Sequence, residues 1–495
     1  IENKEKILVF GDFDADGITS TVILSDFLEY CQADVSWYIP HRIKEGYSIQ
    51  PEHISMAADQ DVDLIITVDC GISSFDAVHK AASEDIDIII TDHHEPGPEL
   101  PCALAVINPK RHDCPSSLYY LAGVGVAFFL VMALRKFLRD KGFWEDTTEP
   151  NLLNRLDLFA VGTIGDMVPL ININRTFCIA GLDLMRKRAR PGLKALADVC
   201  RVDISKIDSD DISYRIVPRL NAAGRISHAR ICVSHLTESN QVSIDKTAGL
   251  LDQFNTKRQQ IEQEIIIDIE KTIASNPDIL EDKLLFLHNE KWAPSVLGIA
   301  ASRLARKYHC PVILLSTGGE YAVGSGRSID QVNIHQALMG CESLLVRFGG
   351  HALAAGLTVK KENLKPLQEK LLEHIKNTYK PEHFQKSLTI DAVLDFKDID
   401  IHLAKELDRL RPFGTANPEP VFLCKDLRVL SSYIIGQKHR KMVFGSSEAP
   451  NHKVEAFHFH IDTQKELLAF FPYIAFKLKV NKFKTESAQM IIEEL

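Results

Sequence analysis

The chain has 495 residues, which is too long for one hydrophobic core, so we expect about three or four domains. Apolar residues make up 45% and charged residues 25% of it, as in an ordinary soluble protein. The net charge of −10 gives no sign of nucleic-acid binding and does not exclude it, because binding depends on local basic surface. The ten cysteines form no CxxC pair, which argues against a zinc site or a disulfide framework and favours a reduced, cytoplasmic protein.

Short apolar runs alternate with helical patterns in the N-terminal part of the chain. Ile7–Phe10, Leu64–Val68 and Ile86–Thr91 are predicted to be buried parallel strands, because each is too apolar to have a face in water. Helical patterns lie between them, at Ser20–Tyr30 and Ser74–Ser83. This alternation predicts a doubly wound α/β sheet, whose ligands collect beyond the carboxyl ends of the strands.

Two longer apolar stretches follow. Tyr119–Leu134 carries no charge, but it is shorter than the roughly 18–20 apolar residues that a membrane span needs, and "LRKFLRDKG" continues it as an amphipathic helix. We therefore predict a buried helix and no membrane association. Leu158–Leu170 is expected to form a fourth element of the first sheet, with Asp166 at a further strand end.

The second half of the chain divides into three parts. Asp245–Ser275 favours helix throughout and is predicted to be a long connector between two lobes. Leu284–His288 and Val312–Leu315 open a second α/β unit. From about Leu388 onward, several short β runs predict a small barrel.

Carboxylates or histidines follow each predicted strand of the first sheet. The groups are Asp12, Asp14 and Asp16 in "GDFDADG", Asp69 in "VDCG", Asp92, His93, His94 and Glu95 in "TDHHEP", and Asp166 in "GTIGDMVPL". Oxygen ligands combined with an imidazole suit Mg²⁺ or Mn²⁺ better than a thiolate-rich zinc site. Two ions about 3.5–4 Å apart would neutralise carboxylates that otherwise repel each other. Such ions activate water and bind phosphoryl oxygens, which indicates phosphoester hydrolysis.

Each of these motifs also has a structural explanation when it is taken alone. Asp16 before Gly17 suits a turn, Asp69 and Asp166 suit helix N-caps, and a His-His pair is often a capped turn or a surface feature. The fold has little reason to place all four clusters at strand ends of one sheet. Their coincidence therefore favours the metal site.

The motifs resemble those of a known superfamily. "DFDADG", "VDCG", "TDHH" and "GTIGDMVPL" are similar, in this order, to the four motifs of the DHH phosphoesterases. "PRLNAAGR", "GSGRS", "FGGHALAAGL" and "RPFGTANPEP" resemble motifs of the RecJ family within it, bacterial 5′→3′ exonucleases of single-stranded DNA. The resemblance spans essentially the whole chain. It implies a DHH catalytic domain with a parallel sheet (1–244), a connector helix (245–275), a DHH-associated α/β domain (276–387) and an OB-fold barrel (388–495).

The resemblance also implies a metal centre and catalytic groups. Residues that match the family's ligands for two Mn²⁺ or Mg²⁺ ions are Asp14, Asp16, Asp69, His93 and Asp166. Asp12 is either a further ligand or a residue that orients one. His94 matches a histidine close to the metals and the scissile phosphate, so we expect His94, Asp166 and His351 to be catalytic. His351 would stabilise the transition state or protonate the leaving oxygen, whereas without the resemblance it would be a packed histidine in a glycine turn.

Arginine side chains bind phosphate through two parallel hydrogen bonds. Three arginines of this chain lie in sequence settings that resemble motifs. Arg42, Arg225 and Arg327, together with Ser325, match the family's pocket for a 5′-phosphate. Such a pocket at a fixed distance from the metals would explain 5′→3′ polarity. Tyr47 matches a ring that stacks on the terminal base, a contact worth about 1–3 kcal/mol. Without the resemblance, we would expect these arginines to lie on a solvated surface and the tyrosine to lie at the edge of a core.

Basic residues of the predicted barrel are candidates for binding the DNA backbone. "GQKHRK" is expected to be a loop between two strands, which carries Lys438 and Arg440 with His439 and Lys441. In "FKLKVNKFK", Lys477 and Lys479 alternate with apolar residues, so one face of that strand would be basic. Lysines on an edge strand can instead protect the sheet against aggregation.

Together, these features predict a two-metal exonuclease that degrades single-stranded DNA 5′→3′ to nucleoside monophosphates in recombination and repair. The alternative enzyme is a DHH phosphodiesterase for short oligonucleotides or cyclic dinucleotides. A scaffold protein is the alternative without catalysis, and the complete set of ligands counts against it. Family expectations add single-stranded DNA, a single-strand-binding protein and a RecQ-type helicase as partners, and a cytoplasmic, nucleoid-associated bacterial monomer.

Overall fold

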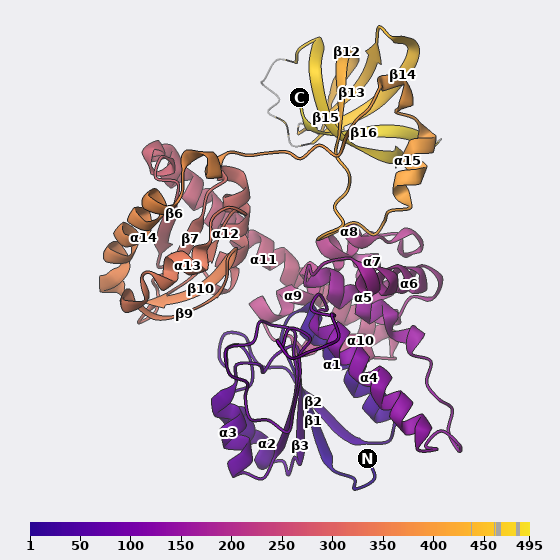
Figure 1. Cartoon of the computed structure of the whole chain (residues 1–495), viewed down its shortest axis with the longest axis vertical. Coiled ribbons are helices and arrows are strands. Elements are labelled where there is room, and N and C mark those ends of the chain that lie inside the picture. Colours follow the sequence, from indigo (N-terminus) through magenta and orange to yellow (C-terminus); the bar gives the residue numbers. More distant parts are fainter. Residues whose placement is uncertain (437, 460, 462–466, 482–485) are drawn as a thin grey trace.

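The computed structural model describes residues 1–436, 438–459, 461, 467–481 and 486–495. Figure 1 shows an N-terminal α/β unit, a smaller α/β unit beside it and a β-barrel at the C-terminal end, with helix α11 (Gln241–Ser275) between the two α/β units. The predicted fold class, a parallel sheet followed by a connector helix, a second α/β unit and a barrel, is confirmed.

The N-terminal unit is built on a sheet of five parallel strands in the order β2-β1-β3-β4-β5. The strands are β1 (Lys6–Gly11), β2 (Asp34–Tyr38), β3 (Leu64–Val68), β4 (Asp87–Thr91) and β5 (Ala105–Ile107). Crossover helices follow β1, β2 and β3, as right-handed βαβ units require. The carboxyl ends of all five strands therefore meet at one edge of the sheet.

Both faces of this sheet are buried. The helices of the unit are α1 (Ala15–Tyr30), α2 (Pro51–Ala58), α3 (Phe75–Ser83), α4 (Gly123–Asp140), α5 (Leu156–Gly165), α6 (Asn172–Arg188), α7 (Pro191–Val199), α8 (Ser209–Asp211), α9 (Val217–Ile226) and α10 (Arg230–Thr237). Because side chains alternate along a strand, Val9 packs under α1, α4 and α5, whereas Phe10 packs under α2 and α3. The uniformly apolar strands follow from this double cover.

Helix α4 contains most of the uncharged stretch Tyr119–Leu134. Its first half is buried against α1 and α5, as predicted. In the part of the chain that the structure describes, no helix is both long and apolar enough to cross a membrane.

The fourth element of the sheet, expected within Leu158–Leu170, is a helix instead of a strand. Residues Leu156–Ile164 of α5 are all buried, so the sequence shows no amphipathic stripe, and an apolar run of this kind suits a buried helix as well as a buried strand. Asp166 is the C-cap residue of α5. The prediction that Asp166 follows a strand of the sheet is therefore wrong.

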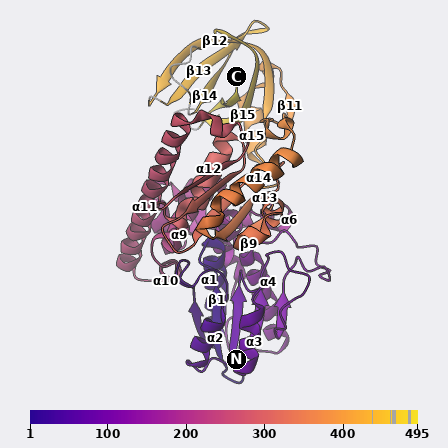
Figure 2. The same cartoon turned by 90° about the vertical axis from the view of Figure 1, so that its left-hand side faces the viewer.

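Helix α11 joins the two α/β units. Its first turns pack on α7, α9 and α10 through Ile244, Ala248 and Leu251. Its last turns bury Ile266 and Ile269 against the second unit. Figure 2 shows α11 as one helix that runs roughly along the long axis of the molecule, from near α10 to the side of the second unit. One continuous helix thus sets the distance between the units.

The second unit is built on a mixed sheet in the order β6-β7-β8-β10-β9. Its elements are β6 (Leu285–Asn289), α12 (Pro294–Tyr308), β7 (Val312–Ser316), β8 (Ala322–Arg327), α13 (Ile334–Met339), β9 (Leu345–His351), β10 (Ala354–Val359) and α14 (Leu364–Thr378). Val312 and Leu314 face α11 and α12, whereas Ile313 and Leu315 face α13 and α14. Helix α12 packs on β7 and β8 and also contacts α9, so it lies between this sheet and the N-terminal unit.

The C-terminal unit is a closed barrel, because β12 pairs with both β13 and β15. Its elements are β11 (Ala392–Val393), α15 (Ile401–Asp408), β12 (Phe422–Ile435), β13 (His439–Ser446), β14 (Ala449–His458), β15 (Phe470–Asn481) and β16 (Ser487–Glu494). The "RPFGTANPEP" segment holds the barrel to the N-terminal unit. The backbone N–H of Leu170 donates to the Thr415 carbonyl at 2.8 Å, and Arg411 lies 3.2 Å from Asp208.

Candidate active site

Asp14 and Asp16 are held by the backbone at the start of α1. Oδ1 of Asp14 accepts the N–H groups of Asp16 and Gly17, so Asp14 is the N-cap of α1. The buried carboxylate of Asp16 accepts the N–H groups of Gly123 and Val124 at 2.6 and 2.7 Å, at the N-terminus of α4. A Cβ at Gly17 would lie 2.5 Å from the Asp12 carbonyl oxygen, so the chain can turn this tightly only with glycine.

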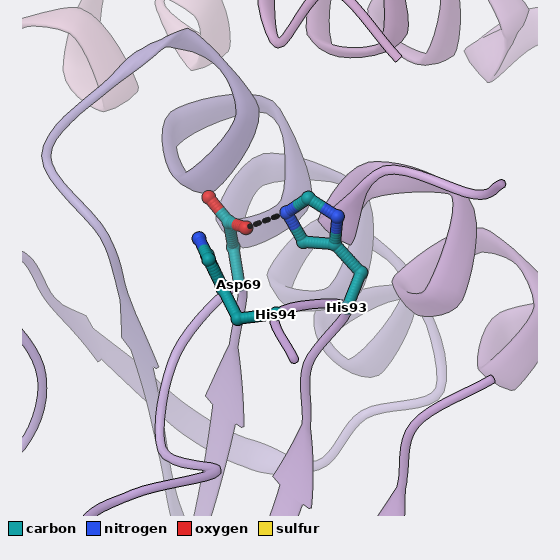
Figure 3. A group of neighbouring side chains, drawn as sticks. All are labelled: Asp69, His93 and His94. Carbon is teal, nitrogen blue, oxygen red and sulfur yellow. Dashed lines mark ion pairs between the residues drawn. The ribbon is translucent and has the colours of Figure 1, made fainter. Parts of the chain in front are cut away.

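His93 brings together carboxylates from three different elements. Its Nε2 lies 3.0 Å from Oδ1 of Asp69, which follows β3, and 3.6 Å from both Oδ2 of Asp16 and Oδ2 of Asp166. Figure 3 shows Asp69 and His93 pointing toward each other from neighbouring loops. Three groups in the described part of the chain have ligand atoms close enough to share an ion: Asp69, His93 and His94; Asp16, His93 and Asp166; and Asp12, Asp14 and Asp69.

These carboxylates cannot all ionise easily without a cation. Burial raises the pKa of Asp16 to about 7, and burial with the neighbouring carboxylates raises the pKa values of Asp12, Asp69 and Asp166 well above the ordinary range. Burial also lowers the pKa of His93 to about 3, so its ring is neutral and does not neutralise them.

The polar atoms at the centre lack partners, which tests whether a metal fits. Among the described residues, Oδ1 of Asp12, Oδ1 of Asp69 and Nε2 of His93 make no hydrogen bond, although all three are buried. The 3.0 Å approach of His93 to Asp69 is therefore a contact between two potential ligands, without hydrogen-bond geometry. Oxygen donors with one imidazole fit hard divalent cations such as Mg²⁺ and Mn²⁺.

Asp92, for which the sequence motifs predicted no role of its own, holds the two histidines in place. Its buried Oδ1 accepts the N–H groups of His93 and His94 and lies 2.7 Å from Nδ1 of His94, while Oδ2 accepts the Ile72 N–H. Burial favours a neutral His94, but the hydrogen bond to Asp92 prevails and raises the pKa of His94 to about 9. A carboxylate directly after a buried strand and before two histidines was the signal that could have identified it.

Tyr47 and His351 lie near His94. The hydroxyl of Tyr47 is 3.2 Å from Nδ1 of His94, and its ring is 5.8 Å away from the imidazole. His351, at the end of β9 in the second unit, is an exposed residue within electrostatic range of His94. Burial, together with the charge of His94, lowers the pKa of His351.

The three predicted phosphate-binding arginines come together from both α/β units. Arg42 and Arg225 belong to the N-terminal unit, and Arg327 ends β8 of the second unit. Burial and the charges of Arg42, Arg258 and Arg327 lower the pKa of Arg225 to about 9. Within the described ranges, none of the three forms an ion pair with a carboxylate. Arg327 donates to Oγ of Ser325 at 2.7 Å, so the predicted Ser325 is part of the same group.

The predicted backbone-binding residues of the barrel have mixed surroundings. Strand β13 begins at His439, so the expectation that His439, Arg440 and Lys441 lie on a loop is wrong, while Lys438 does lie in the turn. Lys477 lies 2.9 Å from Glu493 and Lys479 lies 3.3 Å from Glu419, so both lysines are already paired. Gln437 and residues 482–484 of these two motifs lie outside the described residues.

A cavity of about 620 Å³ extends from Arg225, one of the three predicted phosphate-binding arginines, to Lys477 of the barrel. It lies between α5, α9, α11 and the "RPFGTANPEP" segment, and the cations along it are Arg225, Arg258 and Lys477. Tyr214 and Met167 also line it, although both side chains are mostly exposed. The sequence motifs predicted no site role for these two residues or for Arg258.

Three family models match the chain. They are the N-terminal domain of the DHH family over residues 6–163, the DHHA1 domain over residues 281–377 and the RecJ OB domain over residues 390–494. Each match falls within one of the three units described above, and residues 164–280, which include α6 to α11, lie between the first two matches.

Relatives of known name cover almost the whole chain. The single-stranded-DNA-specific exonuclease RecJ of Escherichia coli is 36% identical over 99% of this chain and 87% of its own length. The crystal structure of Thermus thermophilus RecJ in complex with Mn²⁺ is 27% identical and has a TM-score of 0.84, covering 100% of this chain and 69% of that one. A second exonuclease RecJ structure, bound to manganese, is 31% identical with a TM-score of 0.65, over 77% of this chain and 93% of that one. The chain therefore belongs to the RecJ family.

Proposed function

We propose that this protein is a metal-dependent exonuclease that degrades single-stranded DNA in the 5′→3′ direction to nucleoside monophosphates, in recombination and repair. The observation that carries the proposal is the buried group of Asp16, Asp69, His93 and Asp166, in which ligand atoms converge without hydrogen-bond partners of their own. The relatives' names supply the substrate, and matched structures hold Mn²⁺ or Mg²⁺.

In this proposal, the residues that hold two ions are Asp14, Asp16, Asp69, His93 and Asp166. Asp12 either adds a ligand or orients one. When bound, the ions lower the pKa of a water molecule and stabilise negative charge on the phosphoryl oxygens. Asp92 fixes the loop that carries both histidines, because its carboxylate accepts both of their backbone N–H groups.

His94 and His351 act on the phosphate from different units of the chain. His94 is protonated near neutral pH, since Asp92 raises its pKa to about 9, so its ring places a positive charge and a donor beside the metal ligands. His351 belongs to the second unit and reaches the site across the interface. There it stabilises charge in the transition state or protonates the leaving oxygen.

The arginine group binds the 5′-phosphate and thereby sets polarity. The charge of Arg42 interacts with those of Asp12 and Asp14 and also with that of Arg327, so the phosphate pocket adjoins the metal centre. A strand whose 5′-phosphate occupies this pocket has its first phosphodiester bond near the ions. Tyr47 stacks on the terminal base, and the rest of the strand follows the cavity that leads to Lys477 and the barrel.

The barrel supports a long substrate over the alternative of short oligonucleotides or cyclic dinucleotides, because a second binding surface beyond the cavity helps only a strand that can reach it. Lys438, Arg440, Lys477 and Lys479 are its candidate backbone contacts. The single-strand-binding protein, the RecQ-type helicase, the monomeric state and the cytoplasmic, nucleoid-associated location stay predictions.

A time course on one single strand, labelled at the 5′ end in one sample and at the 3′ end in another, tests the proposal. With Mn²⁺ or Mg²⁺, the 5′ label should leave at once as a mononucleotide, while the 3′ label remains on steadily shortening strands. The same sequence as a blunt duplex is the control and should stay intact, and chelator should stop the reaction. Release of the 3′ label first, or products longer than one nucleotide, would contradict the assigned polarity or product.

A further inference from the structure

Helix α12 supports two arginines that come from different units. Nη1 of Arg225, from α9, donates to the carbonyl oxygen of Ser295 at 2.7 Å. The guanidinium of Arg327, from β8, lies over Gly298. Residues three apart on a helix share a face, so Ser295 and Gly298 form one small platform under both guanidinium groups.

Gly298 leaves no room for a side chain. A Cβ built there would lie 2.8 Å from Nη2 and 3.3 Å from Cζ of Arg327, and 3.1 Å from Oγ of Ser325. Glycine weakens a helix interior relative to alanine, and Gly298 lies inside α12 with an ordinary helical backbone, so the helix itself does not require it. Glycine is required at residue 298 because the guanidinium of Arg327 approaches so closely.

The part of Arg327 that would have to move is its guanidinium. Its backbone is paired with Val312 on one side and with Ala354 on the other, in the middle of the sheet. Nη1 donates hydrogen bonds to Oγ of Ser325 at 2.7 Å and to the Gly326 carbonyl oxygen at 2.8 Å. Nη2, the atom nearest to Gly298, donates to no acceptor among the described residues. A methyl group at residue 298 would therefore displace the end of a flexible side chain and leave the fold in place.

We propose that Gly298 is a positioning residue of the 5′-phosphate pocket, an inference that rests on the function proposed above. Its missing side chain lets Arg327 lie against α12 beside Arg225, where Nη2 is available for a phosphate oxygen. The bidentate geometry that makes arginine selective for phosphate needs such a fixed guanidinium plane.

The test compares cleavage of one single strand that carries either a 5′-phosphate or a 5′-hydroxyl group. The ratio of the two kcat/KM values measures recognition of the 5′-phosphate and does not respond to a general loss of active enzyme. Gly298→Ala should lower this ratio roughly ten- to hundred-fold, the value of a hydrogen bond to a charged group. The matched control is Gly249→Ala on α11, where a Cβ would meet nothing within 4 Å and the ratio should stay that of the wild type.

Arg327→Ala and the double variant Gly298→Ala/Arg327→Ala complete the experiment. Arg327→Ala should lower the ratio, and adding Gly298→Ala should lower it no further, because both changes remove the same contact. An unchanged ratio in Gly298→Ala, or a further fall in the double variant, would overturn the role of Gly298. So would a melting temperature of Gly298→Ala far below that of Gly249→Ala, since the glycine would then serve helix packing. A wild-type ratio in Arg327→Ala would overturn the phosphate pocket itself.

Discussion

Oδ1 of Asp92 lies 2.7 Å from Nδ1 of His94, and the same oxygen accepts the backbone N–H groups of His93 and His94. One buried carboxylate thus holds a candidate metal ligand and a candidate catalytic histidine in a single loop. Residues that orient ligands in this way commonly matter almost as much as the ligands.

Replacement of Asp92 tests this relationship. Asp92→Ala should lower kcat/KM and the affinity for Mn²⁺ roughly 10- to 100-fold, because the His93–His94 loop loses its anchor. Titration of activity with Mn²⁺ measures both effects. Asp92→Asn is the matched control, since it keeps the shape and one acceptor oxygen for the two backbone N–H groups and should lose less. Full activity of Asp92→Ala would show that the loop does not depend on this carboxylate.

Asp166 is predicted to act in the chemical step. Asp166→Ala should lower cleavage by roughly a thousand-fold or more, since a metal ligand contributes several kcal/mol to transition-state stabilisation. Binding of a long single strand, measured by fluorescence anisotropy without cleavage, should remain close to that of the wild type because the backbone contacts lie elsewhere. Asp198→Ala, which removes an exposed carboxylate on α7, is the control and should behave as the wild type in both measurements. An active Asp166→Ala variant would remove Asp166 from the site.

The buried carboxylate of Asp69 is expected to destabilise the folded protein when no metal is bound. Burial, with Asp16 and other carboxylates, raises its pKa well above the ordinary 3.8, so the folded chain holds a proton that the unfolded chain releases. The free energy of unfolding of the metal-free protein should therefore fall as the pH rises above the ordinary 3.8 of the unfolded chain. Asp69→Asn removes the charge, and asparagine tolerates the left-handed backbone at this residue, where φ is +63°.

The melting temperature checks this prediction at pH 7 with chelator and with Mn²⁺. Metal-free Asp69→Asn should melt at the same temperature as the metal-free wild type or above it, while activity is lost. Mn²⁺ at about 100 times its dissociation constant should stabilise the wild type by about 2.7 kcal/mol and the variant by less. A metal-free variant that melts well below the wild type would show that the carboxylate stabilises the fold.

The barrel residues Lys438 and Arg440 are predicted to contact the DNA backbone. The double variant Lys438→Ala/Arg440→Ala should bind a long single strand more weakly, and the salt dependence of its affinity should fall by a slope of about 1.4 for two lost contacts. Anisotropy titrations at several salt concentrations measure this slope. Lys365→Ala on α14 is the control, because it removes an exposed lysine far from the barrel. An unchanged slope in the double variant would exclude these two residues from the interface.

Much of the site could be predicted from the sequence because its signals are local. Asp14 and Asp16 follow a uniformly apolar strand, and so do Asp69 and His93, and parallel strands end at one edge of a sheet. The fold class followed from the same alternation. Asp166 shows where such reasoning fails, since a fully buried helix and a fully buried strand have the same apolar composition.

Other features depend on contacts between distant parts of the chain. In the sequence, Asp92 is a carboxylate like the predicted metal ligands. Only its hydrogen bonds to His93 and His94 show that it positions these histidines. The sequence predicts that Lys479 is available to bind DNA, whereas folding brings Glu419 to within 3.3 Å of its amino group.

The sequence by itself determined which elements form and which residue types stand at their ends, because strand and helix patterns depend on neighbours along the chain. Only the tertiary structure decided which of these ends meet. The length and packing of α11 bring Arg225 of one unit and Arg327 of the other onto the same face of α12, and no local pattern encodes that distance. Side chains far apart in the chain come together through the packing of whole elements, which is why the phosphate pocket emerges only in the folded protein.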